Sequence, residues 1–154
     1  MTNPTPGETS LKTLLSTLHP ILHPQTYIFL TLPPTNPLTQ PNNLPTLFTA
    51  LQPEMLFHES EGLTVITTKQ RAEENGLTGY VFECKKISLS VHSSLAAVGL
   101  IAAISARFKE AGISCNVVSG FWHDHVFVPL GEEGAAMRVL GGIVEDAIAR
   151  GEDE

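Results

Sequence analysis

Apolar residues recur along this chain at helical spacing in some segments and in strand-like runs in others. Leucines at helical spacing follow Thr9 and Ser10, two candidate caps, and predict a short first helix that ends before His19-Pro20. Strand-like runs bounded by turn residues span residues 27–32, 55–59, 63–68 and 79–91. Helical patterns span residues 44–51, 69–75, 95–111 and 132–149, with a β-hairpin expected between the last two.

The two longest predicted helices have well-defined apolar faces. The helix over residues 95–111 ends at Gly112. Its apolar face consists of Leu95, Val98, Ile101, Ile104 and Phe108. The face of the last helix consists of Met137, Leu140, Val144 and Ile148. Glu132 and Glu133 precede this helix, where the positive end of its dipole favours negative charge.

Two segments depart from this regular periodicity. Residues 33–45 are rich in proline, which fixes φ and lacks a donor, so a surface loop is expected there instead of a strand or helix. The loop is interpreted as a tolerated insertion or, alternatively, as a polyproline recognition site. In the strand over residues 79–91, the apolar positions change parity at Lys85-Lys86, which predicts a bulge or bend.

The order of elements repeats between the two halves of the chain. Tyr27 aligns with Leu89, and Val65 aligns with Phe127, each pair being 62 positions apart. The pattern predicts an α+β fold of two ferredoxin-like βαββαβ units, each an antiparallel sheet with helices on one face. The expected boundaries are residues 1–76, which include the proline-rich loop, and residues 77–150.

Composition narrows the classes of function. The formal net charge of the 154 residues is −7, which argues against binding to a nucleic-acid backbone. Residues 1–10 contain no basic or apolar signal pattern, and no later run has membrane-spanning length, so a soluble cytoplasmic protein is expected. Cys84 and Cys115 are the two cysteines, and their apolar surroundings predict buried free thiols.

The second half also resembles a known family. The segments V-H-S-S-L-A-A-V-G-L-I-A-A-I-S, A-G-I-S-C-N-V-V-S-G and W-H-D-H-V-F-V-P are similar to those of stand-alone tandem ACT-like proteins. The resemblance covers residues 11–140 and implies a regulatory or sensing protein that binds an amino acid or a similar metabolite between two units. It departs from the family at residues 33–45, which replace most of the first unit's leading helix.

The residues after His92 form the candidate ligand site. Unpaired N–H groups at the expected helix start can bind a carboxylate, which Ser93 and Ser94 could also contact. Simple helix capping by these two serines is the alternative. Asn116 or Asp124 could bind the ligand's ammonium group, although Asn116 could instead stabilise a turn. The full set is Ser93, Ser94, Leu95, Ala96, Ala97, Val98, Gly99, Asn116 and Asp124.

Three histidines form a weaker candidate for a metal site. His123 and His125 have the strand spacing that lets two imidazoles share Zn²⁺, and His92 could add a third ligand. Hydrogen-bonded structural histidines are the alternative. No G-x-S-x-G elbow supports a serine nucleophile, so neither catalytic residues nor a cofactor are expected.

Three functions are therefore weighed. The first is a non-enzymatic sensor of an amino acid that acts as a homodimer or on a regulatory partner protein. The second is a ligand-free protein–protein interaction module. The third is a metal-dependent enzyme that uses His123 and His125.

Overall fold

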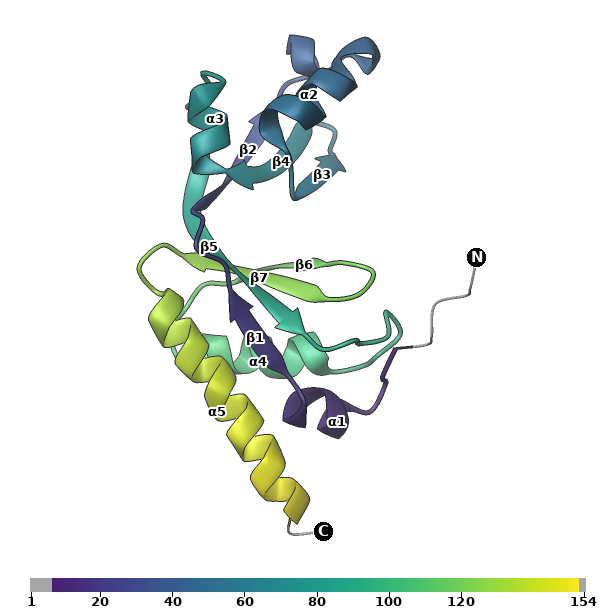
Figure 1. Ribbon diagram of the computed structural model, residues 1–154, viewed down its shortest axis with the longest axis vertical. Helices are drawn as coiled ribbons and strands as arrows, with labels where there is room; N and C mark the ends of the chain where they lie inside the picture. The colour runs from purple at the N-terminus through teal and green to yellow at the C-terminus, as the bar shows by residue number, and fades with distance from the viewer. Residues whose placement is uncertain (1–6, 153–154) are drawn as a thin grey trace. The chain divides into compact units, whose positions relative to one another are not determined.

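The computed structural model describes residues 7–152, which form two compact units (Figure 1). The central unit is Pro24–Cys84, and the terminal unit combines Met1–His23 with Lys85–Glu154. The two units are defined by the contacts within each of them. The boundaries 1–76 and 77–150 were instead defined by the sequence repeat, and they stay a prediction. Residues 1–6, part of the segment inspected for a signal, lie outside the described residues.

The central unit contains every element of a βαββαβ fold. Its elements in order are β2 (Tyr27–Leu32), α2 (Leu44–Leu51), β3 (Met55–His58), β4 (Leu63–Thr68), α3 (Lys69–Glu74) and the first part of β5 (Val81–Ser90). The strands lie in the order β3-β4-β2-β5, and the β2–β4, β3–β4 and β2–β5 pairs are antiparallel. The first half of the sequence repeat is thus a ferredoxin-like sheet with two helices.

The proline-rich segment of the central unit contains two short helical turns, η1 (Pro37–Thr39) and η2 (Pro41–Asn43). The expectation of a loop without helix was wrong in this respect. Asn36 Oδ1 accepts a hydrogen bond from Leu38 N at 2.9 Å, and Asn43 Nδ2 donates to the Pro37 carbonyl at 2.8 Å. Proline suits the first position of such turns because no N–H is needed there.

The terminal unit has the same strand order with an unexpected source for one strand. Its elements are α1 (Leu11–Ser16), β1 (His19–Leu22), the second part of β5, α4 (Leu100–Glu110), β6 (Asn116–Ser119), β7 (Asp124–Pro129) and α5 (Glu133–Glu152). β1 pairs antiparallel with β5, and the order continues through β7 to β6. β1, from the start of the chain, occupies the place that the last strand holds in the central unit.

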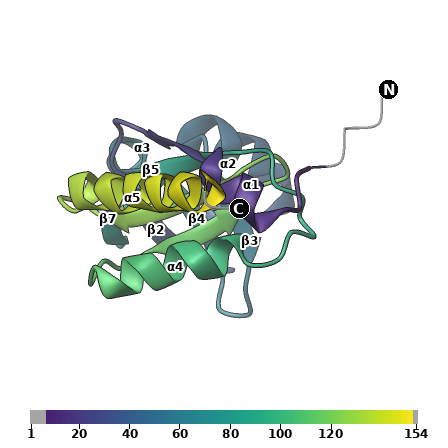
Figure 2. The same ribbon diagram turned by 90° about the horizontal axis from the view of Figure 1, so that it is seen from below.

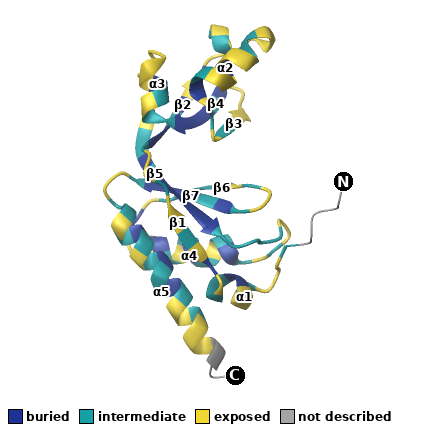
Figure 3. Ribbon diagram, viewed as in Figure 1, coloured by how far each residue is buried: buried dark blue, intermediate teal, exposed yellow. Residues whose placement is uncertain are grey.

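The core of the terminal unit lies between its sheet and its helices. Ile87 and Leu89 of β5 and Val126 and Val128 of β7 contribute alternate side chains, all of which are buried. The helices contribute the buried residues Leu14, Leu100, Ile104, Phe108, Ala136, Leu140 and Ile143. Figures 2 and 3 show α4 and α5 beside the sheet and the buried residues on their inward faces. No helix among residues 7–152 combines the length and apolarity needed to cross a membrane.

Two local expectations differ from the structure, and a third lies close to it. α4 begins at Leu100 instead of residue 95, so Leu95 and Val98 are 70% and 83% exposed instead of buried. Ile148 of α5 is 46% exposed because the buried stripe of this helix runs through Ala136, Leu140 and Ile143. In β5 the register with β2 shifts between Val81 and Cys84, where Phe82 has φ 56°, just before the predicted bulge or bend at Lys85-Lys86.

The two thiols differ in accessibility, which predicts different reactivity. Cys84 is fully buried, its Sγ donates to the Tyr27 carbonyl at 3.4 Å, and burial raises its pKa to about 12. Cys115 is only partly buried, although desolvation also raises its pKa. Because the thiolate is the reactive form, iodoacetamide at pH 8 should label Cys115 at least about tenfold faster than Cys84. Mass spectrometry of timed digests measures both labelling rates. Equal rates in the folded protein would contradict this prediction, whereas equal rates in guanidinium alone would not.

Candidate functional site

Residues 93–99 precede α4 and are not the first turns of a helix. Ser93 forms an isolated bridge with Glu8, and Ala97 N donates to the Ser94 carbonyl at 2.9 Å, which closes a turn. Ser94 N donates to the Glu8 carbonyl and Glu8 N donates to the His92 carbonyl, both at 2.9 Å. The Ser94 hydroxyl accepts a hydrogen bond from Ala96 N at 3.1 Å. Ser93 and Ser94 are therefore not the caps of α4, and the expectation that the helix begins directly after them was wrong. The pairing with Glu8, remote in sequence, fixes the position of Ser93 and Ser94.

The start of α4 leaves backbone donors available. Gly99 is its N-cap with φ 101°, a conformation that favours glycine, and it has no side chain to cap the helix. Ala103 N donates to the Gly99 carbonyl, and no described residue accepts a hydrogen bond from the N–H groups of Leu100, Ile101 or Ala102. Three donors at the positive end of the helix dipole are thus free to bind an anionic group.

Asp124 supplies a carboxylate that lines the same pocket as these donors. It is the first residue of β7, pairs with Ser119 of β6, and is only 8% exposed. Among residues 7–152, none forms a hydrogen bond or ion pair with its side chain.

The serine segment, the start of α4 and Asp124 line one cavity of about 190 Å³, here called the Asp124 pocket. Its lining residues are Ser93, Ser94, Leu95, Ala97, Gly99, Leu100, Ile101, Ala102, Ser119 and Asp124. Hydrogen-bond donors and a negative carboxylate therefore border the same small space. This arrangement is complementary to a ligand that carries both a negative and a positive group.

Comparison with protein families identifies this fold. Models described as ACT domain match residues 6–85 and, separately, residues 81–141. The chain belongs to the ACT domain family. The Asp124 pocket lies within the terminal unit, and all its lining residues fall inside the second ACT match.

Solved structures with a similar fold include a protein of unknown function and a regulatory subunit of aspartate kinase. A protein of unknown function from Vibrio cholerae, VC0802, described as a possible transport protein, is 34% identical, with 88% of this chain and 97% of that chain covered and a TM-score of 0.72. The aspartokinase alpha and beta subunits are 18% identical, with coverages of 82% and 97% and a TM-score of 0.59. The regulatory subunit of aspartate kinase from Thermus flavus is 14% identical, with coverages of 80% and 95% and a TM-score of 0.56. No curated protein matches the sequence.

The ACT fold brings most of the predicted ligand residues together. Six of the nine line the Asp124 pocket: Ser93, Ser94, Leu95, Ala97, Gly99 and Asp124. Ala96, Val98 and Asn116 do not, and Asn116 is exposed at the start of β6. Sequence reasoning missed Ser119, whose place opposite Asp124 follows from the hairpin register, and it missed the donors of Leu100 to Ala102 because it placed the helix start too early.

The three histidines of the candidate metal site, His92, His123 and His125, have separate partners. His125 Nδ1 is 2.8 Å from Ser88 Oγ, and His123 Nδ1 is 3.2 Å from the Val91 carbonyl oxygen. The His92 ring lies 4.8 Å from the Trp122 ring, centroid to centroid. Within the part of the chain that the structure describes, no three His, Cys, Asp or Glu side chains are placed to hold a metal ion.

Proposed function

We propose that this ACT domain protein is a non-enzymatic regulator that binds a small amino acid in the Asp124 pocket. The observation that carries the proposal is the unpartnered carboxylate of Asp124, a residue that is 8% exposed, in one pocket with three free backbone donors. The α-ammonium group would pair with Asp124, and the α-carboxylate would accept hydrogen bonds from the start of α4. Contacts with the protein would thereby compensate both charged groups of the ligand for the water that they lose on binding.

The size of the pocket supports an amino acid with a short side chain. A volume of about 190 Å³ has room for about six water molecules at about 30 Å³ each. Pockets for larger metabolites typically have about 300–1,000 Å³. Leu95 lines the pocket and is 70% exposed, so a ligand would have access from the protein surface.

Regulation would follow from different affinities in two states. The amino acid can shift the equilibrium with a second copy or with a partner protein only if it binds the two states unequally. The regulatory descriptions of the aspartate kinase subunits make such a role a reasonable expectation for this chain. A cytoplasmic location, where free cysteines stay reduced, forms part of the proposal.

Calorimetric titration with each of the twenty amino acids tests this proposal. At least one small amino acid should bind the full chain, and Asp124→Asn should bind it at least about tenfold more weakly because a charge-assisted hydrogen bond contributes about 1.5–3 kcal/mol. The matched control is Asp146→Asn, which removes an exposed carboxylate paired with Arg107 and should leave the affinity unchanged. Absence of binding, or unchanged affinity in Asp124→Asn, would overturn the assignment of this pocket.

An interaction module without a ligand is the second candidate, favoured by exposed apolar side chains of the terminal unit. Leu95, Val98, Phe121 and Trp122 are between 49% and 83% exposed. Phe121 and Trp122 pack edge to face with ring centroids 5.0 Å apart. Larger apolar patches on soluble proteins commonly mark interfaces. Sedimentation velocity separates the two functions, because only the sensor should change its association when the amino acid is added.

A further inference from the structure

Three polar side chains of the terminal unit meet on the face of its sheet that is opposite to α4 and α5. They belong to His23, which directly follows β1, to Ser88 of β5 and to His125 of β7. Ile87 and Val126, their neighbours in sequence, pack into the core with the helices. Because side chains alternate along a strand, Ser88 and His125 lie on the other face. β5 lies between β1 and β7, so three adjacent strands bring these side chains together.

The two histidines of this group converge on one atom. His23 Nε2 and His125 Nδ1 each lie 2.8 Å from Ser88 Oγ. The backbone holds His23 in place, since its N donates to the Lys86 carbonyl at 2.9 Å. Ser88 is 8% exposed, whereas both histidines are only partly buried. The rings thus keep contact with solvent, while the residue that they share is buried.

The protons of this group determine what it can bind. A hydroxyl has a single proton, so Ser88 donates to one of the two nitrogens and accepts an N–H from the other. A neutral imidazole can carry its proton on either nitrogen. After a change of tautomer in one ring, both histidines would therefore direct a lone pair toward the same point. Two convergent imidazole lone pairs are the donor set of a metal cation.

The ligand atoms select the class of metal. Imidazole nitrogen suits Zn²⁺ and Cu²⁺, whereas Mg²⁺ and Ca²⁺ prefer carboxylate and carbonyl oxygens. Zn²⁺ bonds imidazole nitrogen at about 2.0–2.1 Å, so rotation of the two rings toward each other would bring both nitrogens to one ion. The Ser88 hydroxyl supplies a neutral oxygen beside them. Among the described residues no third His, Cys, Asp or Glu completes the group, so water would take the remaining positions and binding would be reversible.

We infer that His23, Ser88 and His125 form a reversible binding site for Zn²⁺ or Cu²⁺. This set differs from the one that the sequence suggested, in which His125 was combined with His123 and His92. A bound ion would link β1, from the start of the chain, to β5 and β7. The inference goes beyond the proposed function and does not depend on it, because none of these three residues lines the Asp124 pocket.

Nuclear magnetic resonance of the histidine ring nitrogens in the ¹⁵N-labelled full chain tests this site. On titration with Zn²⁺, the ring signals of His23 and His125 should change together. They should do so at a lower concentration than those of His19 and His58, which are exposed. Mg²⁺ at the same concentrations should change none of them. No change of His23 up to about 1 mM Zn²⁺ would overturn the inference, and a joint change of His123 and His125 without His23 would support the set suggested by the sequence.

Substitution of each histidine by glutamine assigns the two nitrogen ligands. Glutamine keeps a hydrogen-bonding group for Ser88, but its amide is a poor ligand for Zn²⁺. Calorimetric titration should show that His23→Gln and His125→Gln each bind Zn²⁺ at least about tenfold more weakly, since loss of even an outer partner of a metal site typically costs about 10–100-fold in affinity. The matched controls are His19→Gln, at the other end of β1, and His123→Gln, and both should bind as the unmodified protein does. Affinity that survives in His23→Gln and His125→Gln would identify the ion as adventitious.

Ser88→Cys tests whether the two nitrogens converge as described. The substitution places a thiol where Ser88 Oγ lies, and a thiolate is a much stronger ligand for Zn²⁺ than a neutral hydroxyl. Affinity for Zn²⁺ should therefore rise at least about tenfold, and it should fall again when His23→Gln is added. Unchanged or weaker binding in Ser88→Cys would contradict a shared site and leave the three side chains as a structural hydrogen-bonded chain.

Discussion

Replacement of Ile104 by alanine should lower the free energy of unfolding of the terminal unit by about 2–5 kcal/mol. Ile104 is fully buried in α4 among the side chains of β5, β7, α1 and α5. The substitution removes buried methyl groups and leaves a cavity that a close-packed core fills only in part. Urea titration followed by Trp122 fluorescence measures the effect, because Trp122 is the single tryptophan and belongs to the same unit.

Ile148→Ala is the matched control for this prediction. Both isoleucines lie on helices of the terminal unit, and both belong to the apolar faces that the helical periodicity predicts. Ile148 is 46% exposed, so its replacement should change the free energy of unfolding by less than about 1 kcal/mol. Equal losses in the two variants would contradict the packing of α4 and α5 described above.

The alternation of apolar residues was sufficient to predict most of the fold. It identified the strands from Tyr27 to Thr68, the helices α1, α2, α3 and α5, and the repeat that relates the two sheets. It missed β1, whose four residues include Pro20 and carry little periodic signal. Proline is tolerated there because β1 pairs on one side only, with β5. Among the described residues, no other strand pairs with β5 at the position of β1. β1 is therefore explained by pairing within the sheet and not by its own sequence pattern.

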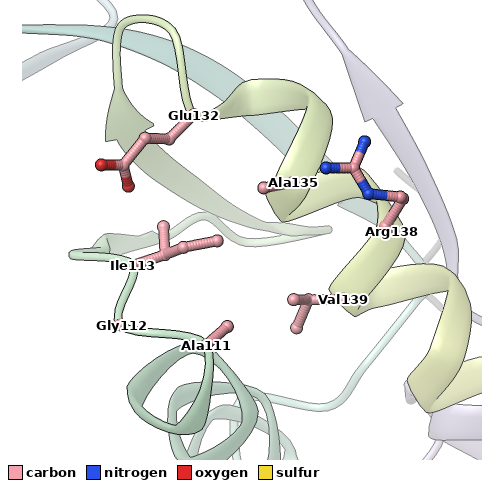
Figure 4. Close-up of a pocket in the computed structure, with 7 residues that line it drawn as sticks. All are labelled: Ala111, Gly112, Ile113, Glu132, Ala135, Arg138 and Val139. Atoms are coloured by element: carbon pink, nitrogen blue, oxygen red, sulfur yellow. The ribbon is translucent and has the colours of Figure 1, made fainter.

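The sequence predicted which residues line the candidate ligand site more accurately than it predicted their backbone conformation. Ser93, Ser94 and Asp124 do line a common pocket, but the serines belong to a non-helical segment before α4. Local propensity favoured helix over residues 95–99, and the pairing of Ser94 with Glu8 overrides it. From the sequence, Glu132 was explained by stabilisation of the helix dipole alone. The structure places it in a pocket that the turn at Gly112 also lines (Figure 4).

Replacement of Gly7 by alanine should release the segment that forms one wall of the Asp124 pocket. A Cβ at Gly7 would lie 2.4 Å from Ser94 N and 2.6 Å from the Ser93 carbonyl carbon, both backbone atoms. The backbone must therefore move apart, at a cost of about 1–3 kcal/mol. The bridge between Glu8 and Ser93 should open, and the amide proton of Ser94, now donated to Glu8, should exchange at least about tenfold faster with solvent.

Gly141→Ala separates this steric effect from a general effect of alanine. Gly141 lies in α5 with no atom within 4 Å of its would-be Cβ, so alanine there should stabilise the helix by up to about 1 kcal/mol. Hydrogen exchange of the Glu8 and Ser94 amides in both variants makes the comparison, and unchanged exchange in Gly7→Ala would contradict the bridge. If the Asp124 pocket binds an amino acid, Gly7→Ala should also weaken that binding, because Ser93 and Ser94 line it. Faster exchange of Ser94 with undiminished affinity would instead place the ligand on α4 and Asp124 alone.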